Sequence, residues 1–104
     1  MSEDVISKLT SEVRDFASSR DWHRFHTPKN LAMAIAGEAG ELASEFQWLT
    51  PEESESGALS LDKRHAIELE IADVQIYLLR LADVLGVDIA GVVREKMTIN
   101  SERF

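Results

Sequence analysis

Residues 61–85 read LDKRHAIELEIADVQIYLLRLADVL, and this stretch decides the fold. Its apolar residues recur every three or four positions, which is the spacing of one face of an α-helix. The main stripe consists of Ile67, Ile71, Val74, Leu78, Leu81 and Leu85. Leu69, Ile76 and Leu79 project on other sides, so the predicted helix is apolar over more than one face. Because such a helix has to be buried nearly all round, we expect it to pack against helices of its own chain and of a second copy.

Three further helices are expected, at about residues 3–19, 28–48 and 89–100. Thr27-Pro28 and Thr50-Pro51 each resemble an N-cap followed by proline at the first helical position. Glu53 adds a capping box to the second pair, Gly86 ends the long helix, and Asp88 can cap the last helix. No segment shows the alternation typical of a strand. The predicted fold is therefore all-α, a single domain over residues 1–104 built as a bundle of about four helices and completed by oligomerisation to a dimer or tetramer.

The composition excludes several classes of protein. The 104 residues include 19 acidic and 11 basic side chains, for a net charge of −8, which argues against non-specific binding to nucleic acid or to an anionic membrane surface. Cysteine is absent, so disulfides and cysteine-based zinc sites are excluded. The apolar runs are too short to span a membrane and the start of the chain has no apolar signal core. We therefore expect a cytoplasmic protein without membrane or nucleic-acid partners.

Two acidic motifs carry the functional prediction: Glu38-Ala39-Gly40-Glu41 and Glu70-Ile71-Ala72-Asp73. Each places two carboxylates one helical turn apart beside an apolar stripe, where they repel one another unless a cation joins them. Solvated acidic pairs are the alternative, but two such motifs on the central helices favour a metal site. Oxygen-only ligation indicates Mg²⁺, with Mn²⁺ possible, and hence phosphoryl chemistry. Glu45 is predicted as an accessory acid.

The order and spacing of these motifs are similar to those of a known family. Glu38-x-x-Glu41, 28 intervening residues and Glu70-x-x-Asp73 resemble the motif of the MazG-like all-α nucleoside triphosphate pyrophosphohydrolases. The flanking segments resemble the dCTP pyrophosphatase branch of that family from about residue 10 onward. These segments are Arg20-Asp21-Trp22, Phe25-His26-x-Pro28-x-Asn30-Leu31, Phe46-Gln47-Trp48, Asp73-Val74-x-Ile76-Tyr77-Leu78 and Lys96-Met97-x-Ile99-Asn100-x-x-Arg103.

The resemblance implies Mg²⁺-dependent hydrolysis of a (deoxy)nucleoside triphosphate, cytosine type favoured, to the monophosphate and pyrophosphate. It implies that Glu38, Glu41, Glu70 and Asp73 bind the metal, with Glu41 the first choice to accept the proton of the attacking water. It further implies substrate contacts: base stacking on Trp22 and Trp48, base reading by His26 and Asn30, a sugar or phosphate contact from Tyr77, and phosphate contacts from Lys96, Asn100 and Arg103.

Two other functions remain open from the sequence. One keeps the fold but changes the substrate to dUTP or to a broad range of dNTPs. The other is a non-catalytic helical interaction module that binds metal without turnover. The intact set of four carboxylates is the feature that argues against the second of these.

Overall fold

The computed structural model describes residues 4–104, and within this range it contains helices and no strand. The elements are α1 (Val5–Ser19), a 3₁₀ turn η1 (His23–Phe25), α2 (Pro28–Ser44), a 3₁₀ turn η2 (Ser56–Ala58), α3 (Leu61–Leu85) and α4 (Ile89–Arg103). The all-α prediction is confirmed.

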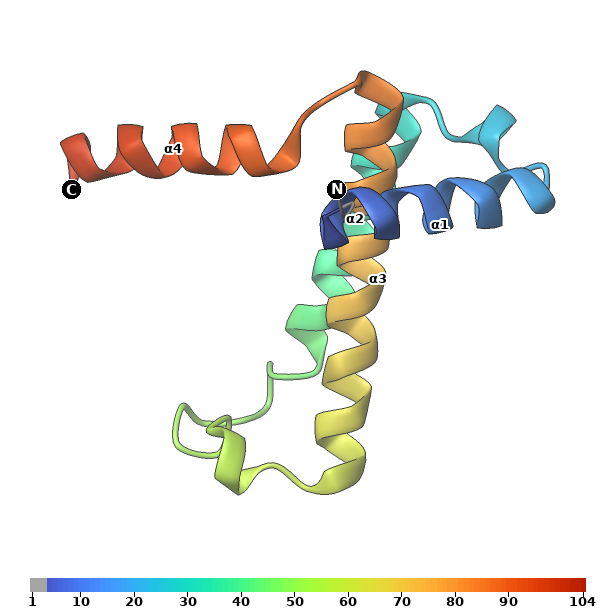
Figure 1. Cartoon of the computed structure of the whole chain (residues 1–104). Helices are drawn as coiled ribbons and strands as arrows, with labels where there is room; N and C mark the ends of the chain where they lie inside the picture. The colour runs from blue at the N-terminus through green and yellow to red at the C-terminus, as the bar shows by residue number, and fades with distance from the viewer. Residues whose placement is uncertain (1–3) are drawn as a thin grey trace.

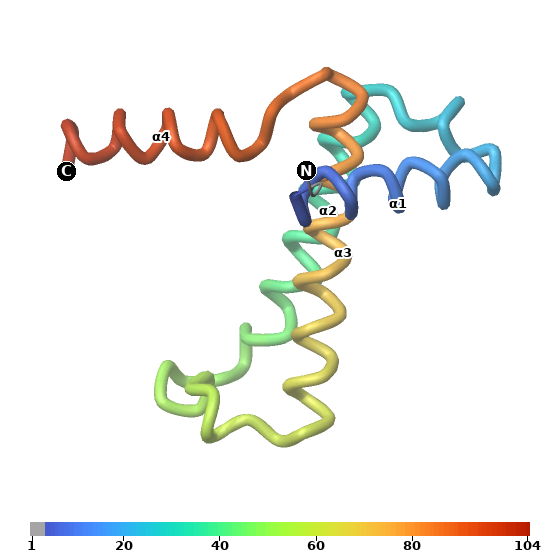
Figure 2. Tube along the Cα trace, viewed as in Figure 1, coloured from blue at the N-terminus to red at the C-terminus, as the bar shows by residue number. Residues whose placement is uncertain are grey.

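The helices α2 and α3 form an antiparallel pair, and α1 crosses α3 near the C-terminal end of α3 (Figures 1 and 2). The buried apolar side chains come from these three helices: Ala17 from α1, Leu31 from α2, and Ile67, Leu79 and Ala82 from α3. The last helix, α4, extends away from the other three (Figure 1). None of the described helices has the length and apolar content needed to cross a membrane.

The predicted helix boundaries rest on hydrogen bonds that the structure shows. Thr27 Oγ1 accepts from the Asn30 N–H at 3.2 Å, which caps α2. Thr50 and Glu53 form the reciprocal pair of a capping box, at 2.8 and 3.2 Å. Gly86 has a φ of +70°, a conformation that suits glycine, and it ends α3 where the sequence predicted.

A second left-handed turn, at Asp21 with a φ of +56°, ends α1. The Trp22 N–H donates to the Ala17 carbonyl at 2.9 Å and the Asp21 N–H to the Ser18 carbonyl at 3.1 Å, which is the Schellman arrangement. The Trp22 ring then meets the Phe16 ring edge to face, with centroids 5.4 Å apart. This turn therefore fixes where Trp22 lies relative to α1.

Three expectations about helix ends are corrected. The second helix ends at Ser44 rather than Trp48, because the N–H groups of Glu45 and Phe46 bond to carbonyls three residues back and tighten the chain into turns. The last helix continues to Arg103 rather than stopping at Asn100. Asp88 occupies the N-cap of α4 as expected, but its side chain makes no capping hydrogen bond.

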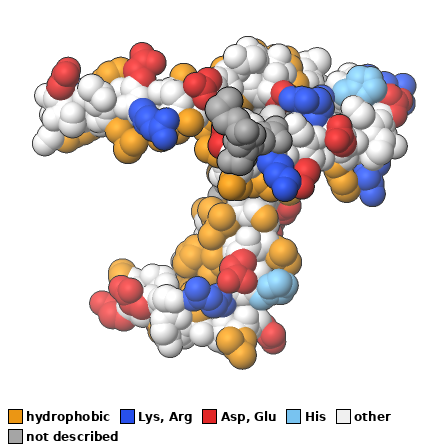
Figure 3. Space-filling view, in the orientation of Figure 1, with side chains coloured by type: hydrophobic (Ala, Val, Ile, Leu, Met, Phe, Trp, Pro, Cys, Tyr) orange, Lys and Arg blue, Asp and Glu red, His pale blue; other side chains and the backbone are white. Residues whose placement is uncertain are grey.

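The single chain leaves much apolar surface uncovered. Ile71 and Leu85, both in the main stripe of α3, are 52% and 56% exposed. The accessible surface is 7849 Å², against about 5,900 Å² for a compact monomer of this mass. The radius of gyration is 16.3 Å, against about 13 Å for a compact domain of this length. Apolar side chains lie along the column of α2 and α3 and along α4 (Figure 3).

Candidate functional site

Three of the four predicted metal ligands converge. Glu38 on α2 and Glu70 and Asp73 on α3 each offer a carboxylate oxygen, and these atoms lie within 4.8 Å of one another. Antiparallel packing of α2 against α3 brings the two motifs together. The Cβ positions at Gly37 and Gly40, which flank Glu38 in α2, are open, with no atom within 4 Å.

The carboxylates of the cluster repel one another, and a bound cation would offset this repulsion. Partial burial raises the pKa of Glu38, and the negative charges of Asp73 and Glu41 raise it further. Partial burial also raises the pKa of Glu70, and Glu41, Asp73, Glu38 and Glu45 add to the effect. Glu70 Oε2 is buried and makes no hydrogen bond to any described residue. An unpaired buried carboxylate oxygen facing two more carboxylates fits a hard divalent cation, so the donor set suits such a metal.

The two remaining acids flank this cluster. Glu41 is exposed and is not one of the three converging residues, but its charge acts on both Glu38 and Glu70. Glu45 Oε1 accepts a hydrogen bond from Lys63 Nζ at 3.0 Å. This ion pair joins the C-terminal end of α2 to the first turn of α3, and it adds a cation that the sequence analysis did not associate with the site.

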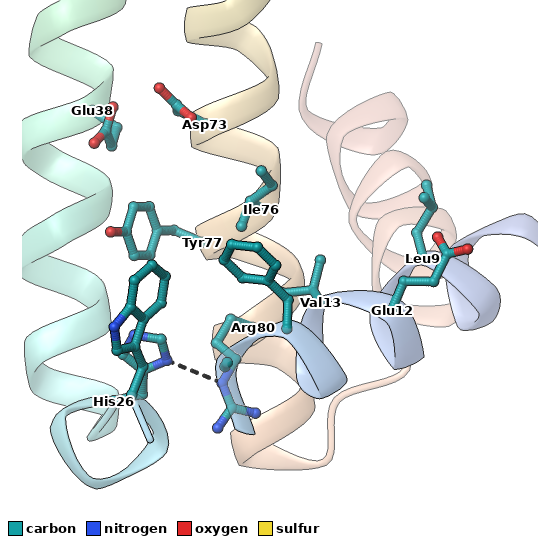
Figure 4. A pocket seen from close by; sticks show the side chains of 12 residues that line it. Leu9, Glu12, Val13, His26, Glu38, Asp73, Ile76, Tyr77 and Arg80 are labelled. Carbon is teal, nitrogen blue, oxygen red and sulfur yellow. Dashed lines mark hydrogen bonds between the residues drawn. The ribbon is translucent and has the colours of Figure 1, made fainter. Parts of the chain in front are cut away.

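A cavity of about 470 Å³ adjoins the cluster and is walled by α1, α2, α3 and the segment before α2. This volume lies in the range of small-ligand pockets. Figure 4 shows Glu38 and Asp73 at one end and His26 and Arg80 at the other, with Tyr77 between them. The wall is mostly apolar or aromatic and includes Leu9, Val13, Phe16 and Ile76.

Three of the residues predicted to bind substrate line this cavity together: Trp22, His26 and Tyr77. Their rings form a chain of tilted contacts, with centroids 6.3 Å apart both from Trp22 to His26 and from His26 to Tyr77. The helical spacing of Asp73 and Tyr77 on α3 sets the carboxylate and the aromatic ring on the same side of the helix. The aromatic end of the cavity would therefore face a flat part of a ligand, and the end with the acidic cluster would face an anionic part.

A sequence profile of the MazG-like family matches residues 33–104. The chain belongs to the MazG-like family. Human dCTP pyrophosphatase 1 is 46% identical over 102 residues, which cover 98% of this chain and 60% of that protein. The bovine protein of the same name is 41% identical over 103 residues, covering 99% and 61% respectively. This MazG-like chain thus spans about 60% of the length of the curated relatives it matches.

The fold also matches a solved structure. A pyrophosphatase from Archaeoglobus fulgidus superposes with a TM-score of 0.89 at 38% identity, covering 100% of this chain and 95% of that one. The whole MazG-like chain, with α4 included, therefore has a counterpart in a crystal structure.

Five residues predicted to contact substrate lie outside the cavity wall of this single MazG-like chain. Trp48 is 88% exposed beyond the end of α2. Asn30 is exposed, and its side-chain amide donates to the Phe25 carbonyl at 3.1 Å. Lys96, Asn100 and Arg103 lie on α4, which extends away from the acidic cluster. Their substrate contacts stay predictions.

The sequence analysis missed Arg80 and Glu12, which also line the cavity. Arg80 follows Asp73 and Tyr77 at seven and three positions, so helical spacing alone places it on the same face of α3. Glu12 neighbours Val13 and Phe16 on α1, a helix that carries none of the sequence motifs described above.

Proposed function

We propose that this chain carries the hydrolytic site of a nucleoside triphosphate pyrophosphohydrolase. The proposed reaction converts a (deoxy)nucleoside triphosphate, cytosine type favoured, to the monophosphate and pyrophosphate, with Mg²⁺ as the cofactor and Mn²⁺ as a substitute. The activity would clear nucleotides from the cytoplasmic pool. The relatives named dCTP pyrophosphatase 1 and the archaeal pyrophosphatase support this class of reaction.

The single observation that carries the proposal is the convergence of Glu38, Glu70 and Asp73, two of which, Glu38 and Asp73, line one end of the cavity. A metal held there would supply Lewis-acid activation of the phosphate and of the attacking water. The oxygen donors of this set match Mg²⁺, which normally shares its coordination with water and substrate phosphates. Glu41, next to the cluster but outside the three converging acids, is our choice for the group that accepts the proton of the water.

The other end of the cavity suits the nucleoside. Stacking of a base on an aromatic ring is worth about 1–3 kcal/mol for any base, so Trp22 would give affinity without choosing among bases. Discrimination then depends on hydrogen bonds, because a site built to bond one polar edge rejects a ligand that lacks it. His26 is the polar cavity residue beside Trp22, and we assign it the role of base reader, with Tyr77 beside the sugar.

We propose in addition that the site is completed in a homo-oligomer, a dimer or a tetramer. The surplus of exposed area and the half-exposed stripe of α3 support this proposal. In such an assembly α4 of a second copy would bring Lys96, Asn100 and Arg103 to the phosphates, which need cations and hydrogen-bond donors. Sedimentation at micromolar concentration tests the assembly, and a monomeric wild type would contradict it.

Hydrolysis is tested with a panel of canonical and 5-substituted dNTPs in Mg²⁺ or Mn²⁺, followed by identification of the products. We expect monophosphate and pyrophosphate, fastest with cytosine nucleotides. A broad profile without cytosine preference would favour the dUTP or general dNTP alternative. Diphosphate and orthophosphate would mean that a different bond is cut, and no turnover would favour the metal-binding module.

The matched variants are Glu38→Gln and Glu68→Gln. Glu38→Gln removes one converging carboxylate and is expected to lower the rate by about a hundredfold to a thousandfold, the scale of losing a key electrostatic group. Glu68 is on α3, the helix that carries Glu70 and Asp73. It is more than half exposed and pairs only with its neighbours Arg64 and His65 among the described residues, so Glu68→Gln should keep the wild-type rate. Normal turnover by Glu38→Gln would refute the assignment.

A further inference from the structure

Arg80 is the one charged residue among the described residues that is buried, at 7% exposure. Its Nε donates to His26 Nδ1 at 3.1 Å, and its Nη1 donates to Asp83 Oδ2 at 3.2 Å. Asp83 in turn accepts two hydrogen bonds from Arg14 of α1, at 2.6 and 2.8 Å. A chain of four polar side chains therefore runs from Arg14 of α1 through Asp83 and Arg80 of α3 to the imidazole in the cavity.

The chemistry of this chain determines the protonation state of His26. A guanidinium group donates hydrogen bonds, accepts none and stays charged. Nδ1 must therefore offer its lone pair to Arg80, which leaves the ring proton on Nε2. Addition of a second proton at Nδ1 would remove this acceptor and place two positive charges side by side, so the neutral ring is favoured.

The surroundings of the His26 ring also favour its neutral form. Burial lowers the pKa of His26, and the positive charge of Arg80 and the nearby His23 lower it further. The other titratable groups that line the cavity are Tyr77, Glu12, Glu38 and Asp73, and the last two lie at the far end of the cavity (Figure 4). Asp83 is the carboxylate that is linked to His26 through Arg80. It already accepts hydrogen bonds from two arginines, and its pKa is lowered mainly by Arg14.

We propose that Arg80 is a positioning residue that determines specificity: it fixes His26 as a neutral imidazole whose Nε2–H is a permanent hydrogen-bond donor to the ligand. The inference deepens the proposed function and rests on it, because it concerns the nucleoside end of the same cavity. The ligand atom that meets His26 is then an acceptor, such as the carbonyl oxygen or unprotonated ring nitrogen of a pyrimidine, and not an exocyclic amine. Asp83 and Arg14 hold the Arg80 guanidinium in place.

The first test measures the imidazole directly. Long-range ¹H–¹⁵N correlation spectra of uniformly labelled protein, recorded across a pH series, report the tautomer and the pKa of His26. We expect the Nε2–H form and a pKa below 6.5 in the wild type. In Arg80→Met, which keeps the length of the side chain but cannot donate, we expect a mixture of tautomers and a pKa above that of the wild type, although burial still keeps it below that of a free histidine.

The second test measures the consequence for the substrate. Loss of the fixed donor should raise KM for the preferred nucleotide about tenfold, with kcat within about twofold, because the acidic cluster is untouched. Arg80→Lys retains a cationic donor and is expected to restore the Nε2–H form. Arg24→Met is the control, because Arg24 is an exposed arginine of the same segment as His26, paired with Asp21.

An Arg80→Met protein that keeps the Nε2–H form with an unchanged pKa would overturn the proposal, as would an unchanged KM. The proposed hydrolysis and the role of Arg80 can fail separately. If the wild type hydrolyses no nucleotide, the proposed function fails, whereas the spectra of His26 still decide whether Arg80 sets the imidazole.

Discussion

Replacing Asp73 with asparagine should change stability in opposite directions with and without metal. Without metal, Asp73 and Glu38 present like charges with oxygens within 4.8 Å of each other. Two unit charges at that separation repel by about 0.9 kcal/mol in the dielectric of water, and the aqueous value applies because Asp73 is exposed. Asp73→Asn should therefore raise the free energy of unfolding by roughly 1 kcal/mol, or the midpoint by about 4–8 °C, in EDTA.

With metal the order should reverse. At a Mg²⁺ concentration of about 100 times Kd, the wild type gains about 2.7 kcal/mol from binding. Loss of a ligand weakens binding at least as much as loss of an outer partner, which costs about 10–100-fold. For a 100-fold loss, the gain of Asp73→Asn falls to about 0.4 kcal/mol at the same concentration. The wild type then becomes the more stable protein by about 1 kcal/mol.

The assay is thermal or urea unfolding followed by circular dichroism at one protein concentration, in EDTA and across a Mg²⁺ titration. Asp15→Asn is the matched control, because Asp15 is exposed on α1 and forms no hydrogen bond or ion pair with another described residue. It should leave both curves unchanged. If Asp73→Asn is less stable than the wild type in EDTA, or gains as much from Mg²⁺, the converging acids do not form a metal site.

Three more outcomes are expected. In EDTA the raised pKa values of Glu38 and Glu70 mean that the folded chain binds protons more readily than the unfolded chain, so the unfolding midpoint should rise as the pH falls from 7 toward 5, and less so in Glu70→Gln. The pKa of Asp83 is lowered in the folded chain, so its effect on stability has the opposite pH dependence. Arg14→Met should be destabilising at pH 7, and its difference from the wild type in free energy of unfolding, measured in urea, should shrink below pH 3.8. Gly86→Ala forces a side chain into a φ of +70° and should lower the free energy of unfolding by roughly 1 kcal/mol, whereas Gly37→Ala in the helical part of α2, whose Cβ meets no atom, should raise it by about 0.5–1 kcal/mol; equal signs in urea unfolding would contradict the backbone argument.

The helices and the acidic cluster followed from the sequence because both depend on local spacing. Apolar periodicity and the caps at Thr27 and Gly86 set the helices, and antiparallel packing of two neighbouring helices was enough to bring Glu38 to Glu70 and Asp73. Positions set by tertiary packing did not follow. The Arg80–His26 hydrogen bond joins residues 54 positions apart, and no local pattern marks it.

The orientation of α4 could not be predicted from the sequence either. Its sequence predicts a helix, but its orientation depends on the turn at Gly86 and on surfaces that the single chain leaves uncovered. The early end of α2 also depended on tertiary structure, because the turn before Thr50 must lead into the loop that returns the chain to α3. Helical periodicity in the sequence continues past Ser44 and carries no sign of this turn.

The walls of the cavity come from different helices, and this has an evolutionary consequence. The carboxylates of Glu38 and Asp73 belong to α2 and α3, whereas Leu9, Val13 and Phe16 belong to α1. Substitutions on α1 can widen or narrow the space offered to a ligand while the charged end keeps its geometry. Descendants of this fold can diverge in the size and shape of the ligand that fits the cavity while they keep the acidic cluster.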